Sequence, residues 1–296
     1  MKARFDSYPI VSVAIVVLMA MVSSCNEYEE SSAITAGEAE ALERNQRYKE
    51  DFEQSFGPID PQHTWGFVGI PAAGESRMTR AAGAPVAEER RVMCEDLASF
   101  DHDFNDVVFD VMFINVTDEG KASARITLQA AGGTLPVYIG SSTQDDAYEV
   151  HHLFGVSSVT PVNVQTSGVK REPVTFMYPE PIQGEQQQDG TWLFDPNKIE
   201  IYVGNTTGQV AQLQTQVGGA PQKFACATSV TWSQELQNIN QGYRNFGTWT
   251  QDDSGWQDAW ANKNLNQSTL YGESLPAPKY TILPITTGVN EEDSTK

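Results

Sequence analysis

Short β-forming segments separated by turn residues dominate the chain after Arg91, and they limit the folds that it can adopt. These segments are rich in β-branched and aromatic side chains, and Gly, Pro, Asn and Asp cluster between them. They cover residues 107–116, 125–129, 134–139, 159–164, 174–177, 191–194, 199–203 and 223–232. Helical segments do not alternate with them, which argues against a parallel α/β sheet. We therefore predict a mainly β fold over residues 92–286, an antiparallel β-sandwich of jelly-roll-like type.

The segment before this region has the pattern of an amphipathic helix. Tyr48, Phe52 and Phe56 recur at intervals of four residues, and a Gly-Pro pair then ends the pattern. Three aromatic side chains on one stripe most often pack onto a core. We predict an aromatic helix and turn segment over residues 37–70, with the helix itself over 37–56.

Composition predicts the character of the remaining segments of the chain. Residues 71–91 are dominated by Pro, Ala, Gly, Arg and Glu without an apolar period, which predicts a linker. Residues 287–296 are a polar tail. Short helical segments are expected near the C-terminus, over residues 233–243 and 253–263.

The N-terminus has the pattern of an export signal. Two basic residues precede an apolar run over residues 10–22, which is shorter than the roughly 20 residues that span a bilayer. The following Val22-Ser23-Ser24-Cys25 resembles the bacterial lipobox. This resemblance implies that residues 1–24 are a lipoprotein signal peptide and that Cys25 carries lipid. The alternative is an ordinary signal peptide that contains a cysteine.

Residues 25–36 then form an acidic tether that includes Glu27, Glu29 and Glu30. An acidic cluster directly after the lipid site resembles the surface-export signal of Bacteroidetes lipoproteins. The resemblance implies a membrane contact through the lipid anchor, an outer-membrane location and display on the cell surface. Attachment at the periplasmic face is the alternative.

The net charge of the chain is −20, from 39 acidic and 19 basic side chains. A protein that binds a phosphate backbone needs clustered basic residues, and the sequence contains no such cluster. Nucleic acid is therefore not expected as a partner. The charge balance instead suits a chain that is highly solvated, collects cations, or both.

An acidic segment over residues 95–110 is the sharpest chemical feature of the sequence. Packed carboxylates repel one another unless a cation neutralises them. Ca²⁺ takes about six to eight oxygen ligands, and alternate Asp and Asn residues in a loop can supply them. The candidate metal ligands are Asp101, Asp103, Asn105 and Asp106, with Glu95 or Asp96 folding back onto them. We therefore predict calcium as a cofactor.

The spacing of this segment is that of an EF-hand only at its beginning. Asp101, Asp103 and Asn105 fit the first positions, but Asp106 stands where that loop requires glycine. The chain then enters a strand instead of a helix. Asp110 lies about 13 Å along this strand from Asp106, too far to share one ion. The alternative to calcium is an Asx-rich turn that holds no ion.

Two further sets of residues leave alternatives open. Cys94 and Cys226 can form a disulfide bond in an envelope compartment, or they can be buried thiols. Trp249, Trp256 and Trp260 can stack on a sugar ring, or they can pack in the core.

Several blocks of the sequence carry a resemblance to a known family. They are residues 94–97 with 101–108, residues 131–137, residues 149–154, residues 220–224 followed by Trp232, Tyr243, Phe246 and Trp249, and residues 48–67. Together they resemble the LruC-type domain, a domain of unknown function in Bacteroidetes lipoproteins, over residues 40–262. The resemblance implies an envelope location and one domain over residues 92–286, and it assigns no activity.

The sequence contains no catalytic signature of the common kinds. An HExxH metal motif, a GxSxG elbow and a phosphate-binding glycine loop are all missing. We therefore predict a non-enzymatic binding or adhesion module at the cell surface, in contact with a glycan or a protein. The alternatives are a structural component of a surface assembly and a glycan-active hydrolase built on a carboxylate pair.

Overall fold

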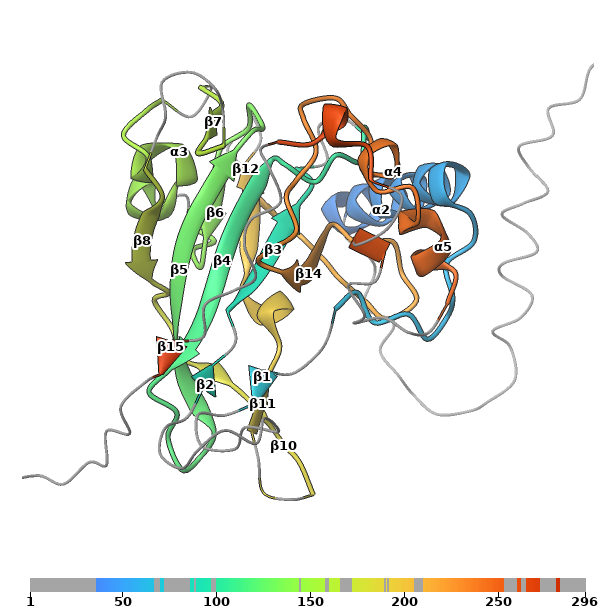
Figure 1. Cartoon of the computed structure of the whole chain (residues 1–296). Coiled ribbons are helices and arrows are strands. Elements are labelled where there is room, and N and C mark those ends of the chain that lie inside the picture. Colours follow the sequence, from blue (N-terminus) through green and yellow to red (C-terminus); the bar gives the residue numbers. More distant parts are fainter. Residues whose placement is uncertain are drawn as a thin grey trace, which may run out of the picture. The chain divides into compact units, whose positions relative to one another are not determined.

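The computed structural model describes most of the β region and the helix before it (Figure 1). The described residues are 36–66, 70–71, 86–87, 89–96, 100–143, 145–157, 160–165, 172–188, 190, 192–204, 210–252, 260–261, 265–271 and 281–282. The predicted signal peptide over 1–24, Cys25 with nearly all of the tether over 25–36, most of the linker over 71–91 and the tail over 287–296 lie outside them. The chain divides into the units Met1–Arg44 and Asn45–Lys296, and the site described below belongs to the second.

Strands outnumber helices in the described residues. The strands are β1 (Ile70–Pro71), β2 (Val86–Ala87), β3 (Arg90–Cys94), β4 (Val107–Ile114), β5 (Lys121–Ala131), β6 (Val137–Ile139), β7 (Val162–Asn163), β8 (Val174–Met177), β9 (Ile182–Gln183), β10 (Glu185–Gln186), β11 (Trp192–Phe194), β12 (Ile201–Gly204), β13 (Val210–Gln212), β14 (Lys223–Ala227) and β15 (Thr281–Ile282). The helices are α2 (Ala36–Phe56), α3 (Val150–Leu153), α4 (Ile239–Gly242) and α5 (Phe246–Thr250). Single 3₁₀ turns cover Asp146–Tyr148, Pro196–Lys198 and Gln267–Thr269.

The main sheet has the order β14-β3-β4-β5-β7, with β8 and β9 also paired to β5, and all its pairs are antiparallel. Two small sheets have the orders β13-β12-β6 and β1-β11-β10, and β15 pairs with β2. Side chains of the sheet β13-β12-β6 share one hydrophobic core with those of the main sheet. The predicted mainly β, antiparallel fold is confirmed, with a helix near the N-terminus and short helical segments near the C-terminus.

Strands β4 and β5 form the centre of the main sheet. Every residue of β4 except the last is buried, so both of its faces are covered. On β5 the side chains of Ala122, Ala124, Ile126 and Leu128 are buried, and the residues between them are partly exposed. This alternation follows from the two-residue period of a strand. Gly120, with a φ of +75°, lies in the turn that joins the two strands.

The aromatic stripe of α2 packs into the core, as predicted. Tyr48, Phe52 and Phe56 are at most 4% exposed. The Tyr48 hydroxyl donates to the carbonyl oxygen of Pro221 at 2.7 Å. Gly57 ends the helix because its φ of +89° suits glycine, and its N–H donates to the carbonyl of Glu53.

The short helices near the C-terminus agree only in part with the prediction. Helix α4 lies inside the expected segment 233–243, whereas α5 begins after it. Of the second expected segment, 253–263, only residues 260–261 are described.

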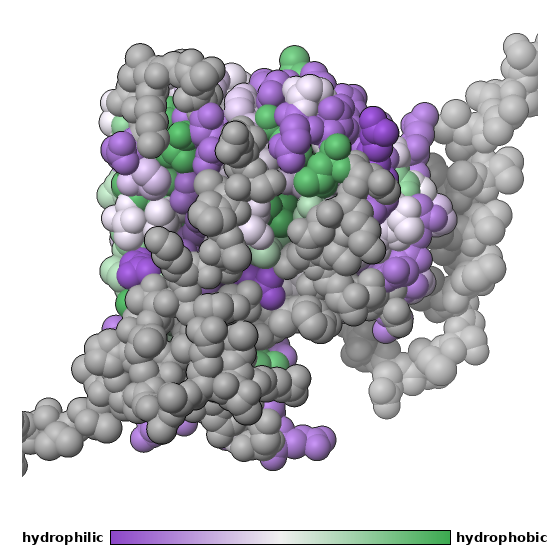
Figure 2. All heavy atoms as spheres, in the orientation of Figure 1, coloured by the Kyte–Doolittle hydropathy of each residue, from purple (hydrophilic) through white to green (hydrophobic). Residues whose placement is uncertain are grey.

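Hydrophilic side chains cover much of the surface that is not grey in Figure 2. Exposed large apolar residues in the Asn45–Lys296 unit, as far as it is described, are Met177, Val217 and Leu236, which come from separate segments. Scattered residues of this kind are normal on a protein surface. None of the helices in the described part of the chain is long and apolar enough to cross a bilayer.

Candidate metal centre

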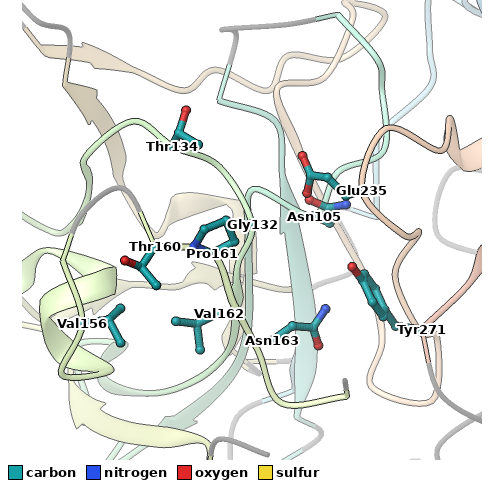
Figure 3. Close-up of a pocket in the computed structure, with 10 residues that line it drawn as sticks. All are labelled: Asn105, Gly132, Thr134, Val156, Thr160, Pro161, Val162, Asn163, Glu235 and Tyr271. Carbon is teal, nitrogen blue, oxygen red and sulfur yellow. The ribbon is translucent and has the colours of Figure 1, made fainter. Parts of the chain in front are cut away.

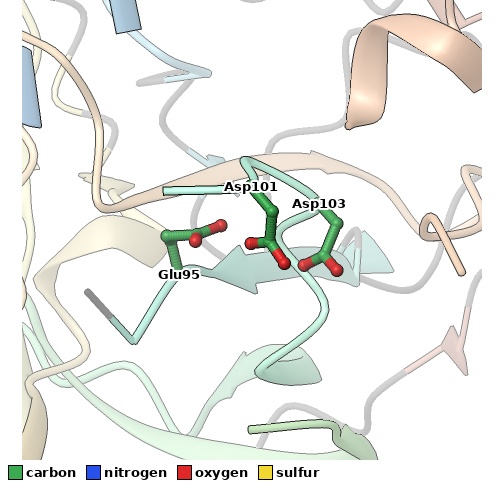
Figure 4. Close-up of side chains that lie close together, drawn as sticks. All are labelled: Glu95, Asp101 and Asp103. Atoms are coloured by element: carbon green, nitrogen blue, oxygen red, sulfur yellow. The ribbon is translucent and has the colours of Figure 1, made fainter. Parts of the chain in front are cut away.

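The acidic loop between β3 and β4 is held by alternate side chains that enter the aromatic core. His102 and Phe104 have φ values of +54° and +53°, in the left-handed region, and both side chains are fully buried. Between and beside them, Asp101 and Asp103 point together toward Glu95 (Figure 4). The loop thus places its aromatic residues in the core and gathers its carboxylates at one point.

His102 fixes the loop to helix α2. Its Nε2 lies 2.9 Å from Oδ2 of Asp51, and its ring lies 5.3–5.5 Å from those of Tyr48, Phe52 and Phe56. Burial lowers the pKa of His102, although Asp51 acts in the opposite direction. The aromatic stripe of α2 therefore supports the loop from behind.

Three carboxylates of this region converge. Glu95, Asp101 and Asp103 each offer an oxygen atom, and these oxygens lie within 4.8 Å of one another. Oxygens that share one Ca²⁺ at about 2.3–2.6 Å lie at most about 5 Å apart. Glu95 is 0% exposed and Asp103 is 1% exposed. This buried acidic cluster can hold a metal ion.

Backbone N–H groups donate hydrogen bonds to some of the carboxylate oxygens in the cluster. The N–H of Leu236 donates to Oδ2 of Asp103 at 2.8 Å, and the N–H of Asn105 donates to Oδ1 at 3.2 Å. The N–H of Phe104 donates to Oε2 of Glu95 at 3.3 Å. Oε1 of Glu95 is buried and has no hydrogen-bond donor among the described residues. A buried acceptor of this kind is costly unless a donor or a cation reaches it.

Asp96 and Asp106 lie beside this trio. The N–H of Asp96 donates to Oδ2 of Asp106 at 2.7 Å. A Cβ atom at Gly133 would lie 2.7 Å from Oδ2 of Asp96 and 2.8 Å from Oδ1 of Asp106. The chain therefore needs glycine at this position, because any larger residue would displace the two carboxylates.

The cluster raises the proton affinity of its own members. Burial is the largest cause of the raised pKa of Glu95, followed by the charges of Asp106, Asp103 and Asp101. Burial and then Asp101 and Glu235 raise the pKa of Asp103 to about 8. The pKa of Asp106 is raised by burial and by the charges of Asp96, Asp103 and Asp101. All these neighbours are carboxylates, so each one that ionises makes it harder for the others to ionise unless a cation is present.

The second loop at the site comes from residues 233–236, which the sequence analysis did not connect with it. The Asn105 Nδ2 donates to the carbonyl of Ser233 at 3.2 Å, and the N–H of Ile239 donates to the carbonyl of His102 at 2.9 Å. Glu235 follows in this loop, and burial together with Asp101 and Asp96 raises its pKa. No local spacing signals this contact, because the two loops are about 130 residues apart in the sequence.

The six predicted ligands all lie in this region of the fold. The structure brings Glu95, Asp101 and Asp103 within reach of one ion. Asp110 lies elsewhere, in an ion pair with Arg91 at 2.7 Å. The bond from the Asn105 N–H to Asp103 is an Asx turn, so the alternative considered from the sequence also describes part of the loop.

Of the two alternatives for Cys94 and Cys226, a disulfide bond or buried thiols, the structure shows buried thiols. No disulfide joins them, and both thiols are buried. In the register of β14 and β3, Cys94 lies opposite Lys223 and Cys226 lies opposite Arg91, so the two sulfur atoms do not face each other. Burial raises the pKa of the Cys94 thiol to about 12.

Trp249 and Trp260, two of the three tryptophans considered for a sugar platform, pack in the core. Trp249 and Trp260 are 5% and 3% exposed, and their rings stack at 5.2 Å. Both also contact the ring of Phe246. Trp256 lies outside the described residues.

Comparisons of the chain with family models, with curated proteins and with solved structures found no match.

Proposed function

We propose that this protein is a lipid-anchored protein of the outer membrane whose β domain binds calcium and acts as a non-enzymatic binding or adhesion module at the cell surface. The observation that carries this proposal is the buried acidic cluster of Glu95, Asp101 and Asp103. The lipobox at Cys25 and the resemblance to the LruC-type domain support the envelope location.

The chemistry of the cluster favours calcium among the common metal ions. Its donors are carboxylate oxygens on an irregular loop, which suit a hard cation with flexible coordination. The softer donors nearby do not face the cluster. The His102 ring is hydrogen-bonded to Asp51, and the Cys94 thiol lies in the core of the sheet. A divalent cation would neutralise the mutual repulsion of the carboxylates and contact Oε1 of Glu95.

Calcium is expected to raise the melting temperature of the full chain. At a hundredfold excess over the dissociation constant, a ligand of the native state adds about 2.7 kcal/mol. For a protein of this size that corresponds to roughly 5–10 °C. The measurement is thermal unfolding in EDTA and in about 1–5 mM calcium, the range of weak extracellular sites, with magnesium as the comparison ion.

The variant pair Asp103→Asn with Asp106→Asn tests whether this site is responsible. It keeps the side-chain volumes and removes two charges, so the calcium-free protein should still fold and the calcium effect should disappear. Asp118→Asn with Asp146→Asn is the matched control, because both residues are exposed and outside the cluster. An equal calcium shift in wild type and in the first pair would refute the site, as would the lack of any shift in wild type whose metal content is shown to be nil.

The lipid anchor is tested separately. Expressed in a Gram-negative host, the wild-type chain is expected in the detergent phase after phase partitioning, with a lipid-modified N-terminal peptide that begins at Cys25. The Cys25→Ser variant should remain unmodified, whereas Cys226→Ala, which changes a buried thiol, should behave as wild type. An unmodified wild-type peptide at Cys25, measured by mass spectrometry, would remove the lipoprotein part of the proposal.

A further inference from the structure

A pocket of about 510 Å³ opens beside the candidate metal centre (Figure 3). Asn105 and Glu235 belong to both features. The other lining residues are Gly132, Thr134, Val156, Thr160, Pro161, Val162, Asn163 and Tyr271. A volume of this size lies in the usual range of small-molecule sites, about 300–1,000 Å³.

One polar atom in the pocket wall has no partner. Asn105 is 2% exposed, and its Oδ1 has no hydrogen-bond donor among the described residues. This atom lies against Gly132, since a Cβ there would be 2.4 Å from it, and Gly132 also lines the pocket. A buried carbonyl oxygen without a donor is unfavourable, and a ligand hydroxyl in the pocket would satisfy it after a small shift of the Asn105 side chain, because Gly132 covers this oxygen.

The two sides of the pocket differ in chemistry. Figure 3 shows Asn105 and Glu235 side by side, with the hydroxyl end of Tyr271 turned toward them. The opposite side carries the hydroxyls of Thr134 and Thr160 next to apolar groups of the α3–β7 segment. A sugar presents the matching groups, hydroxyls that donate and accept and apolar C–H faces that pack on an aromatic ring.

Charge selects among the polar ligands. The carboxylate of Glu235 lines the pocket and no basic side chain is among the lining residues, so an anionic ligand would be repelled. A neutral ligand rich in hydroxyl groups meets no such barrier, and its hydroxyls can donate to Asn105 and Glu235.

We infer that this pocket binds a neutral saccharide and that binding is coupled to the cation in the acidic cluster. The inference rests on the proposed function, because it requires the calcium site to exist. It deepens that function by naming the class of ligand and the residues that contact it.

Asp103 provides the physical link between the two sites. Its Oδ1 accepts the N–H of Asn105 and its Oδ2 accepts the N–H of Leu236, the neighbour of Glu235. A cation held by Asp103 would therefore fix both loops that form the polar side of the pocket. Coupling between two binding sites is reciprocal, so the saccharide must raise the affinity for calcium by the same factor.

The test is binding of the full chain to an array of neutral and sialylated glycans, followed by calorimetric titration with the neutral glycan that gives the strongest signal. Binding is expected in calcium, at least tenfold weaker in EDTA, and absent for the sialylated form of the same glycan. No binding to any neutral glycan in calcium would overturn the inference, and so would equal affinity in EDTA.

A pocket variant separates this inference from the calcium site. Thr160→Trp fills the pocket from an exposed position whose hydroxyl lies 2.8 Å from that of Ser157. Thr143→Trp is the matched control, since Thr143 is exposed outside the pocket and its hydroxyl lies 3.0 Å from that of Ser141. Both variants should keep the calcium-induced rise in melting temperature, and only the first should lose glycan binding by tenfold or more.

The outcomes of the two experiments distinguish the two failures. A normal calcium shift without any glycan binding would leave the proposed calcium site standing and remove the inference. A wild-type protein without a calcium shift would remove both. Glycan binding that Thr160→Trp does not weaken would place the saccharide elsewhere and overturn the assignment of this pocket.

Discussion

Replacing Arg91 by methionine is expected to destabilise the folded protein by about 3–5 kcal/mol, the cost of breaking a buried ion pair from one side. Arg91 is 1% exposed on β3, between β14 and β4 of the main sheet. Its Nε and Nη2 donate to the two carboxylate oxygens of Asp110, at 2.7 and 2.9 Å. Its Nη1 donates to the carbonyl of Val230, and the guanidinium lies 5.0 Å from the centre of the Trp232 ring.

The loss is large because Asp110 would remain buried without its counter-charge. The Gln129 Nε2 donates to Oδ2 of Asp110 at 3.0 Å, and a neutral amide does not replace a guanidinium. The measurement is equilibrium unfolding in denaturant. Arg125→Met is the control on the neighbouring strand, because the Arg125 pair with Glu89 is 4.0 Å long and partly exposed and should be worth less than about 1 kcal/mol.

The double variant Arg91→Met with Asp110→Leu separates the charge effect from simple loss of packing. Removing both partners leaves no uncompensated charge, so the double variant should be more stable than Arg91→Met alone. If Arg91→Met costs less than about 1 kcal/mol, or if the double variant loses the sum of both single effects, the ion pair does not have the role assigned to it.

The fold followed from the sequence wherever the signal was local. The stripe of Tyr48, Phe52 and Phe56 has a helical period that few other structures satisfy, and the helix ends at the predicted residue. The β-forming run at 107–116 likewise became β4. Its partner β5 is longer than the run at 125–129 that predicted it. Pairing with β4 and β9 extends the strand through residues of lower β propensity such as Ser123 and Ala122.

The candidate metal site, like the fold, could be predicted only where its signal in the sequence was local. The density of carboxylates at residues 95–106 pointed to a cation site because like charges need compensation, whatever the fold. Glu235 and the pocket depend on tertiary packing that brings distant loops together, and no spacing in the sequence reports it. The choice between a disulfide and buried thiols was open for the same reason, since the register of β3 and β14 decides that Cys94 and Cys226 do not face each other.

Raising the pH from about 6.5 to 8 is expected to destabilise the calcium-free protein. Asp103 has its pKa raised to about 8 in the folded state, whereas the unfolded chain releases this proton near pH 4. Between these values the folded state binds more protons, so stability falls as the pH rises, by about 1.4 kcal/mol per pH unit for each such group. The raised pKa values of Glu95 and Asp106 act in the same direction.

The pH window lies above most of the histidine titration, but Lys223 opposes the trend at its upper end. Burial lowers the pKa of this ammonium group to about 8, so the folded state loses a proton there that the unfolded chain keeps. Burial lowers the pKa values of His63 and His102, which are therefore already neutral in the folded protein above pH 6.5. Calcium requires the deprotonated carboxylates, so it should remove most of the pH dependence and stabilise the protein more at pH 8 than at pH 6.5.

The experiment compares melting temperatures in EDTA and in calcium across this window, for wild type and for Asp103→Asn. The variant carries no titrating group at position 103, so its slope in EDTA should be shallower than that of wild type, whereas Asp118→Asn, in an exposed turn, should leave the slope unchanged. A slope in EDTA that Asp103→Asn leaves unchanged would show that this carboxylate is not held protonated. Some other positive charge would then have to compensate the cluster. In that case the cluster would no longer need a cation.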